Sequence, residues 1–177
     1  MKTLNAIAQR LFAFGAGLSM ALVFAIIFVN SLRRYTVGQS VPWGEELPIY
    51  MTVYGVMFGL ALAYMQDRHI RFTILTDFLP DGIRHKLFAA VDLASCVTGI
   101  ALAVSGHAFA VRRGHIDASG LKSAANWLVE TTGIDALAWV AKVGTWQYAI
   151  AVGGAMLAVA AFLKFVERIS SSKAVPA

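Results

Sequence analysis

Charge and cysteine are both scarce in this chain of 177 residues. Charged residues make up 14% of the sequence and hydrophobic residues 58%, which is more apolar side chain than a soluble domain of this length needs for its core. The composition therefore indicates a membrane protein. Cys96 is the single cysteine, which excludes an intrachain disulfide and a cysteine metal cluster.

Motifs of catalysis and cofactor binding are also missing. The sequence contains no nucleophile elbow, no phosphate-binding glycine loop and no metal-ligand spacing of the H-x-x-x-H or C-x-x-C type. We therefore expect no catalytic residue, no metal site and no cofactor, and the chain is not predicted to be an enzyme. Its net charge of +5 comes from Lys and Arg in the gaps between apolar runs, a distribution that fits lipid headgroups and not nucleic acid.

Four apolar runs predict an all-α integral membrane protein with four transmembrane helices. They cover about residues 11–32, 47–66, 87–111 and 143–163. Twenty helical residues reach about 30 Å, the thickness of the hydrocarbon core of a bilayer. The first run exceeds the apolar region of a cleavable signal, so we expect it to be retained as a span. Residues 1–177 would then form one membrane domain, with a disordered tail at 170–177.

The distribution of positive charge predicts that both termini lie in the cytoplasm. Four spans put the termini and the linker between the second and third spans on one side of the membrane. That side holds nine Lys and Arg residues and the opposite side holds six. The tryptophans fall in or beside the two opposite linkers, where their rings would lie at headgroup depth, and they are Trp43, Trp127, Trp139 and Trp146.

The linker at 112–142 predicts a short amphipathic helix before the last span. Residues 123–130 would form this helix, with Ala124, Trp127 and Leu128 on its apolar side. The segment is too short and too polar to cross a bilayer, so we expect it to lie in the membrane interface.

The interiors of the spans carry almost no ionisable groups. The first, second and fourth runs hold no charged residue, and the third holds Asp92 and His107, each near one end. A transporter that works alone normally has ionisable groups in mid-membrane, and a haem anchor needs two axial ligands at matching depth. A self-sufficient exporter that uses Asp92 and a haem or quinone anchor of a redox enzyme are therefore the weaker alternatives to a partner-binding protein.

Charged and aromatic residues gather at the entrance of the second span, and they are Arg33, Arg34, Tyr35, Trp43, Glu45 and Glu46. Two interpretations remain open. The charges form a half-buried ion pair that fixes how helices meet, or they are solvated and mark the bilayer boundary. Helical spacing also predicts one shared side of this span, made of Glu46, Tyr50, Tyr54 and Met57.

Small residues recur at four-residue intervals on two spans. Gly55 and Gly59 form a G-x-x-x-G pair on the second span. The first span carries a longer small-residue stripe, made of Ala13, Gly17, Ala21 and Ala25. Small side chains let helices approach closely in lipid, so both faces are predicted to contact another helix.

A series of residues occurs in a characteristic order around the first two spans. The series is Arg34-Tyr35, Trp43 with Glu45-Glu46, Phe58-Gly59, His69-Ile70 and Leu79-Pro80. It resembles the DctQ-like small membrane subunit of tripartite ATP-independent periplasmic (TRAP) transporters. Beyond residue 87 the resemblance rests on the four-span pattern, and the linker at 112–142 departs from the shorter connection that the resemblance leads us to expect.

The resemblance implies a division of labour between three proteins. In this family a periplasmic substrate-binding protein captures an organic acid, a large membrane subunit moves it inward with sodium, and the small subunit binds the large one. This chain would then be a non-catalytic subunit in the bacterial inner membrane that braces its partner, and the partner would hold the sodium ions. The motif or interface positions it implies are Arg34, Tyr35, Trp43, Glu45, Glu46, Gly55, Gly59 and His69.

Overall fold

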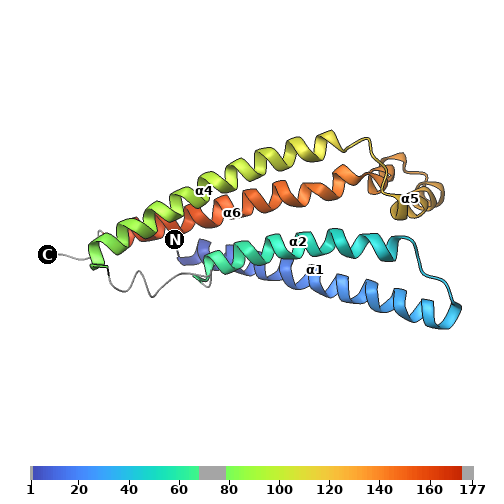
Figure 1. Ribbon diagram of the computed structural model, residues 1–177, viewed down its shortest axis with the longest axis horizontal. Coiled ribbons are helices and arrows are strands. Elements are labelled where there is room, and N and C mark those ends of the chain that lie inside the picture. The colour runs from blue at the N-terminus through green and yellow to red at the C-terminus, as the bar shows by residue number, and fades with distance from the viewer. Residues whose placement is uncertain (1, 68–78, 173–177) are drawn as a thin grey trace.

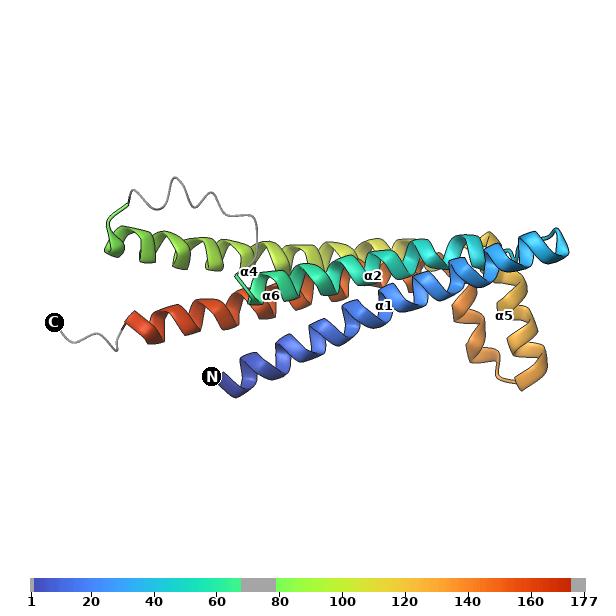
Figure 2. The same cartoon turned by 90° about the horizontal axis from the view of Figure 1, so that it is seen from below.

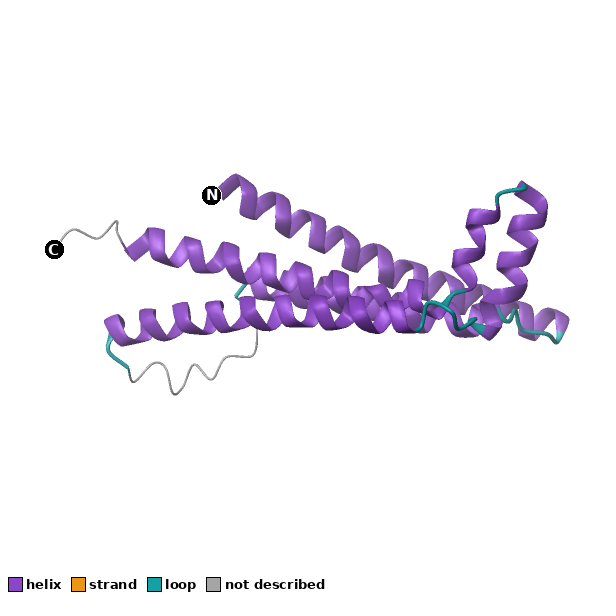
Figure 3. Ribbon diagram, turned by 90° about the horizontal axis from the view of Figure 1, so that it is seen from above, coloured by secondary structure: helices purple, strands orange, loops and turns teal. Residues whose placement is uncertain are grey.

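Four long helices run side by side and make up most of the protein (Figures 1 and 3). The computed structural model describes residues 2–67 and 79–172, and every regular element in these ranges is a helix. Each long helix is long and apolar enough to cross a bilayer. The predicted all-α fold with four spans is confirmed, and the spanning helices are α1 (Lys2–Val37), α2 (Trp43–Met65), α4 (Asp81–Arg112) and α6 (Val143–Ser172).

Three of the helices extend beyond the apolar runs from which we inferred them. α1 begins at Lys2 and α4 at Asp81, well before the corresponding runs. α6 continues to Ser172, into the first residues of the predicted tail, and residues 173–177 lie outside the described ranges. Lys, Arg and Glu are good helix formers, so the charges that end an apolar run do not end its helix.

The long helices form two antiparallel pairs, α1 with α2 and α4 with α6 (Figure 1). The main contact between the pairs is made by α2 and α6. The beginning of α1 and the end of α6 lie at one end of the bundle, which we call the terminal end (Figure 1). At the other end, the arm end, α5 (Ser119–Thr132) and the 3-10 helix η1 (Asp135–Ala141) form an arm that projects sideways from the bundle (Figure 2).

Glycines let α4 and α6 pack backbone against backbone. A Cβ atom on Gly99 would lie 2.6 Å from Ala158 N, and a Cβ on Gly106 would lie 2.6 Å from Ala151 N. Gly154 fits against the backbone of α4 in the same way. Because packing drives helix association in lipid, these glycines account for the most extensive helix contact in the bundle.

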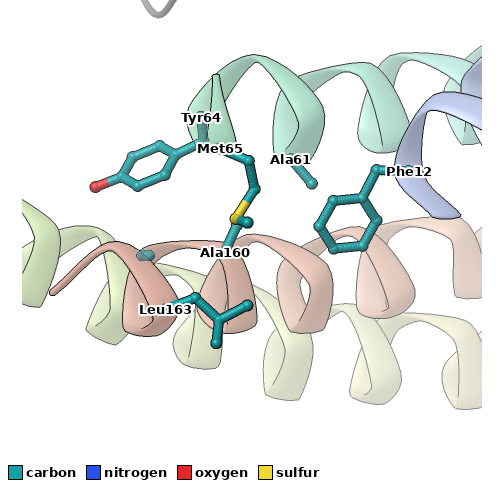
Figure 4. Close-up of a cluster of buried hydrophobic side chains, with 7 residues drawn as sticks. Phe12, Ala61, Tyr64, Met65, Ala160 and Leu163 are labelled. Atoms are coloured by element: carbon teal, nitrogen blue, oxygen red, sulfur yellow. The ribbon is translucent and has the colours of Figure 1, made fainter. Parts of the chain in front are cut away.

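The buried core is small and rich in alanine. It lies between α1, α2 and α6 near the terminal end (Figure 4) and contains Phe12, Ala61, Tyr64, Met65, Ala160, Ala161 and Leu163. Large apolar side chains point outward instead, and Phe14 and Phe24 are each 69% exposed. A soluble protein rarely exposes so much apolar surface, whereas a bundle surrounded by lipid requires it.

Candidate functional site

The turn between α1 and α2 places the first turn of α2 beside the end of α1. Gly38 has a φ of +74°, a left-handed conformation that glycine adopts without steric cost. Asn30 Oδ1 accepts a hydrogen bond from Val41 N at 2.7 Å. The side chain of Asn30 also fits against Gly44, where a Cβ would lie 2.8 Å from Asn30 Cγ. The turn therefore has a defined geometry, and it brings Glu45 and Glu46 to the arm end.

Glu46 connects α2 to the arm. Its carboxylate oxygens accept hydrogen bonds from Tyr50 Oη at 2.8 Å and from the backbone N of Gly120 at 2.8 Å. Gly120 lies in the first turn of α5, where the backbone N–H groups have no helical partner and the helix dipole favours negative charge. A Cβ on Gly120 would lie 2.6 Å from the carbonyl oxygen of Pro42, so the contact is tight. Glu46 thus fixes the arm to the bundle.

The neighbouring charges of this cluster are exposed. Glu45 is exposed, and its carboxylate accepts a hydrogen bond from Ser40 Oγ at 2.7 Å. Within residues 2–67 and 79–172, Arg34 forms no ion pair with either glutamate, and Tyr35 is 89% exposed. Within these ranges Glu46 is bonded to neutral groups, and the half-buried ion pair and the solvated boundary both stay open as interpretations of the cluster.

The side of α2 predicted from helical spacing faces α6. The ring of Tyr50 stacks on that of Trp146, with centroids 5.7 Å apart. Trp146 Nε1 in turn donates a hydrogen bond to the carbonyl oxygen of Val140 at 2.9 Å, which ties this pair to η1. Further along, Met57 fills the space beside Gly153 of α6. Aromatic stacking at the arm end and the Met57 contact further along α2 therefore hold the two helix pairs together.

Only part of the small-residue pattern is used inside the chain. Gly55 is buried and fits against Ser19 and Met20 of α1, as predicted. At Gly59, by contrast, no described atom lies within 4 Å of the position of a Cβ. The small-residue stripe of α1 is exposed along its whole length. His69 lies outside the described residues, so its predicted role stays a prediction.

The arm has its own ionic contact at its base. Asp117 pairs with Lys142 at 2.6 Å and with Lys122 at 3.3 Å, and Ala118 N donates to the carbonyl oxygen of Ala141 at 2.6 Å. Lys142 first, and Lys122 next, hold the pKa of Asp117 below its ordinary value of 3.8, so this carboxylate is charged at neutral pH. The two ends of the arm are joined here, where α5 and η1 leave the bundle.

The predicted amphipathic helix is present as α5, which is longer than the segment from which we inferred it. Leu121 and Ala125 are buried against the bundle, whereas Trp127 is exposed. The apolar side predicted from the sequence is therefore not the side that packs on the chain. Gly133, with a φ of +69°, ends the helix in the left-handed conformation typical of a helix C-terminus.

A polar cluster at the terminal end was not predicted from the sequence. Asp92 of α4 is only 2% exposed, and its carboxylate accepts a hydrogen bond from Tyr64 Oη at 2.7 Å and pairs with Arg168 Nε. Arg168 also pairs with Asp67 at 3.1 Å, and Lys164 pairs with Asp67 at 2.6 Å. The sequence signal that could have predicted this cluster was Asp92 in the third run together with Lys164 and Arg168 at the end of the fourth. Antiparallel helices bring these positions to a similar depth in the membrane.

Reactive groups are sparse in the described ranges. Among those residues, no three His, Cys, Asp or Glu side chains are arranged to hold a metal ion. His107 lies against Tyr148 with ring centroids 5.6 Å apart, on the exposed side of α4. The polar groups described above bind one another, and this arrangement fixes the positions of helices.

Comparison with known proteins agrees with the resemblance. The chain is 26% identical over 109 residues to the sialic acid TRAP transporter small permease protein SiaQ of Vibrio cholerae, a match that covers 62% of this chain and 63% of that protein. It is 29% identical over 93 residues to the C4-dicarboxylate TRAP transporter small permease protein DctQ of the same species, covering 52% and 38%. The matches therefore span less than two thirds of these relatives.

A similar stretch occurs in a larger relative. The sialic acid TRAP transporter permease protein SiaT of Haemophilus influenzae is 29% identical over 84 residues, a match that covers 48% of this chain and 13% of that protein. Residues 23–171 match the family described as tripartite ATP-independent periplasmic transporters, DctQ component. With its four apolar helices, the chain is a multi-pass protein of the bacterial inner membrane. It belongs to the DctQ component family of TRAP transporters.

Proposed function

We propose that this chain is the non-catalytic small permease subunit of a TRAP-type transporter and that it braces a large membrane subunit during sodium-coupled uptake of an organic acid. One observation carries the proposal: Asp92, the carboxylate buried within the spans, is bonded to other parts of the same chain, whereas the outer faces are apolar. A bundle of this kind has a surface for a partner, and its buried carboxylate is not free to carry a solute.

The proposed role of this chain assigns the remaining steps of transport to the large subunit and the binding protein. Sodium ions bind to the large subunit, and a periplasmic binding protein delivers the substrate. The relatives named for sialic acid and for C4-dicarboxylates support an organic acid. Positive charge favours cytoplasmic termini, which puts the arm on the periplasmic side. There its exposed Trp127 and Trp139 are available to the headgroup region or to the binding protein.

The large subunit binds to the outer face of α1. The small-residue stripe on this face is exposed and allows another helix to approach closely. Near the arm end, Arg34 lines an open groove of about 640 Å³ between α1 and α2. Because Arg34 and Tyr35 have no partner among the described residues, contacts with a neighbouring chain would explain their presence in the family motif.

Reconstitution with and without this subunit tests the bracing role. The large subunit and the loaded binding protein are placed in liposomes with a sodium gradient, and uptake of the labelled acid is measured. We expect uptake to fall to background without the subunit, while the binding protein keeps its ligand affinity. Undiminished uptake by the large subunit alone would refute the proposal, as would uptake by this chain alone.

Ala21→Leu tests the interface. The new side chain would project from the small-residue stripe, so we expect co-purification with the large subunit to drop at least tenfold, which corresponds to about 1.4 kcal/mol. Ala101→Leu is the matched control, because Ala101 is exposed on the outer face of α4. Loss of the complex in the Ala101 variant, with Ala21→Leu unaffected, would place the partner on α4 instead.

A further inference from the structure

Asp92 is an unusual residue for the inside of a membrane bundle. It lies about three turns from the beginning of α4 and its side chain is enclosed. A buried carboxylate is tolerated only when it is paired and its oxygens are hydrogen-bonded. Both conditions are met, because Tyr64 of α2 and Arg168 of α6 bind its two oxygens.

The partners of Asp92 are themselves fixed. Arg168 donates a second hydrogen bond to Asp67 at 3.1 Å, and its guanidinium lies 5.1 Å from the ring centre of Phe88. A planar guanidinium suits this combination of two carboxylates and an aromatic face. Tyr64 also belongs to the buried apolar core, and its hydroxyl group points out of the cluster in Figure 4. The ion pair is therefore built into the packing.

The network continues to the remaining helix. Lys164 of α6 pairs with Asp67 at 2.6 Å and with Glu167 at 3.5 Å. Glu167 accepts a hydrogen bond from Asn5 Nδ2 of α1 at 3.0 Å. We call this network the terminal clamp, and it consists of Asn5, Tyr64, Asp67, Asp92, Lys164, Glu167 and Arg168.

We propose that the terminal clamp locks the two helix pairs into one rigid body and that Asp92 is its central positioning residue. The clamp connects α1, α2, α4 and α6, whereas the main apolar contact between the pairs is limited to α2 and α6. Lipid gives little driving force for that contact, so polar bonds decide whether the pairs can slide past one another. The inference rests on the proposed bracing function, since a brace must not deform when its partner moves.

The geometry assigns Asp92 a fixed role and not an ion-carrying one. A carboxylate that carries an ion or a proton must exchange it during each cycle, which requires a change of partner. Both oxygens of Asp92 are bound within the chain, and Arg168 supplies a permanent counter-charge. Replacing one partner of such an ion pair leaves the charge of the other buried without compensation. Replacing both partners leaves no uncompensated charge.

Three variants test the clamp: Arg168→Met, Asp92→Asn and the double variant. Thermal unfolding of the purified subunit in detergent gives the first readout. We expect Arg168→Met to lower Tm by about 10 °C, because it leaves the Asp92 carboxylate buried without its counter-charge. The double variant should recover at least half of this loss in Tm. Lys142→Met is the matched control, because it breaks an exposed pair at the arm end and should shift Tm by only about 2 °C.

Distances between the helix pairs give the second readout. Spin labels replace the exposed Ile7 of α1 and Ile83 of α4 in a Cys96→Ala background. We expect one narrow distance distribution for the unmodified clamp, a broad one for Arg168→Met and a partly restored one for the double variant. Unchanged distributions and Tm in Arg168→Met would overturn the proposal.

Uptake by the complete transporter separates positioning from transport. If Asp92 only positions helices, the double variant supports more uptake than Arg168→Met. If Asp92 carries an ion or a proton, Asp92→Asn and the double variant are equally inactive, and the clamp proposal is wrong. Failure of the bracing function itself would be seen in the omission experiment, whereas Tm and distances test the clamp on the isolated subunit.

Discussion

Gly106→Leu is expected to prevent this subunit from folding. Even a Cβ at this position would lie 2.6 Å from Ala151 N and 2.9 Å from its Cα, and these backbone atoms cannot rotate away. Overpacking by one methyl group costs about 1–3 kcal/mol in a packed core, so Gly106→Ala should lower Tm by roughly 5 °C. Leucine would separate α4 from α6 altogether. Size-exclusion chromatography of the detergent-solubilised subunit should then show aggregate and no monodisperse peak.

Gly59→Leu is the matched control for this experiment. Both glycines lie six residues before the end of a spanning helix, but the space beside Gly59 is open in the described part of the chain. We expect the isolated Gly59 variant to elute and unfold like the unmodified protein. The close packing of α4 and α6 would be contradicted by a Gly106→Leu subunit that is monodisperse and equally stable.

Glu46→Ala is expected to release the arm from the bundle. The substitution removes hydrogen bonds to Tyr50 Oη and to the backbone N of Gly120, and bonds to a charged group contribute about 1.5–3 kcal/mol each. Only the Gly120 bond joins α2 to the arm, because Tyr50 lies on α2 itself, so the local loss is about 1.5–3 kcal/mol and the open population of the arm increases roughly ten- to a hundredfold. Hydrogen exchange at the first amides of α5 should accelerate by that factor while the spanning helices stay protected.

Glu45→Ala is the control for the arm. It removes the adjacent carboxylate, which is exposed and bonded to Ser40 alone among the described residues. We expect exchange in α5 to be unchanged in this variant. Equal acceleration in both variants would mean that the arm responds to total negative charge at the entrance of α2, and the specific role of Glu46 would be refuted.

The sequence was sufficient to predict the spans because their signal is local. An apolar run of about twenty residues has to satisfy its backbone internally in lipid, and a helix does this without any other part of the chain. The same local reasoning placed Glu46, Tyr50 and Met57 on one side of α2, since these residues share a single helix.

Contacts between helices could not be predicted in this way. The repeat at Gly55 and Gly59 predicted one close face, yet the backbone contact forms at Gly99, Gly106 and Gly154. Small residues are common in all four spans, so spacing alone does not show which stripe meets another helix. The small-residue stripe of α1, which the structure leaves exposed, illustrates this ambiguity.

By itself the sequence determined that this protein crosses a membrane with four helices, that its tryptophans gather at one end, and that its spans carry few ionisable groups. Each of these properties depends on the composition of one segment. Only the tertiary structure decided that Asp92 is bonded to Arg168 and Tyr64, and that Glu46 holds α5. These bonds join residues far apart in the chain, and their formation depends on the rotation and depth of packed helices.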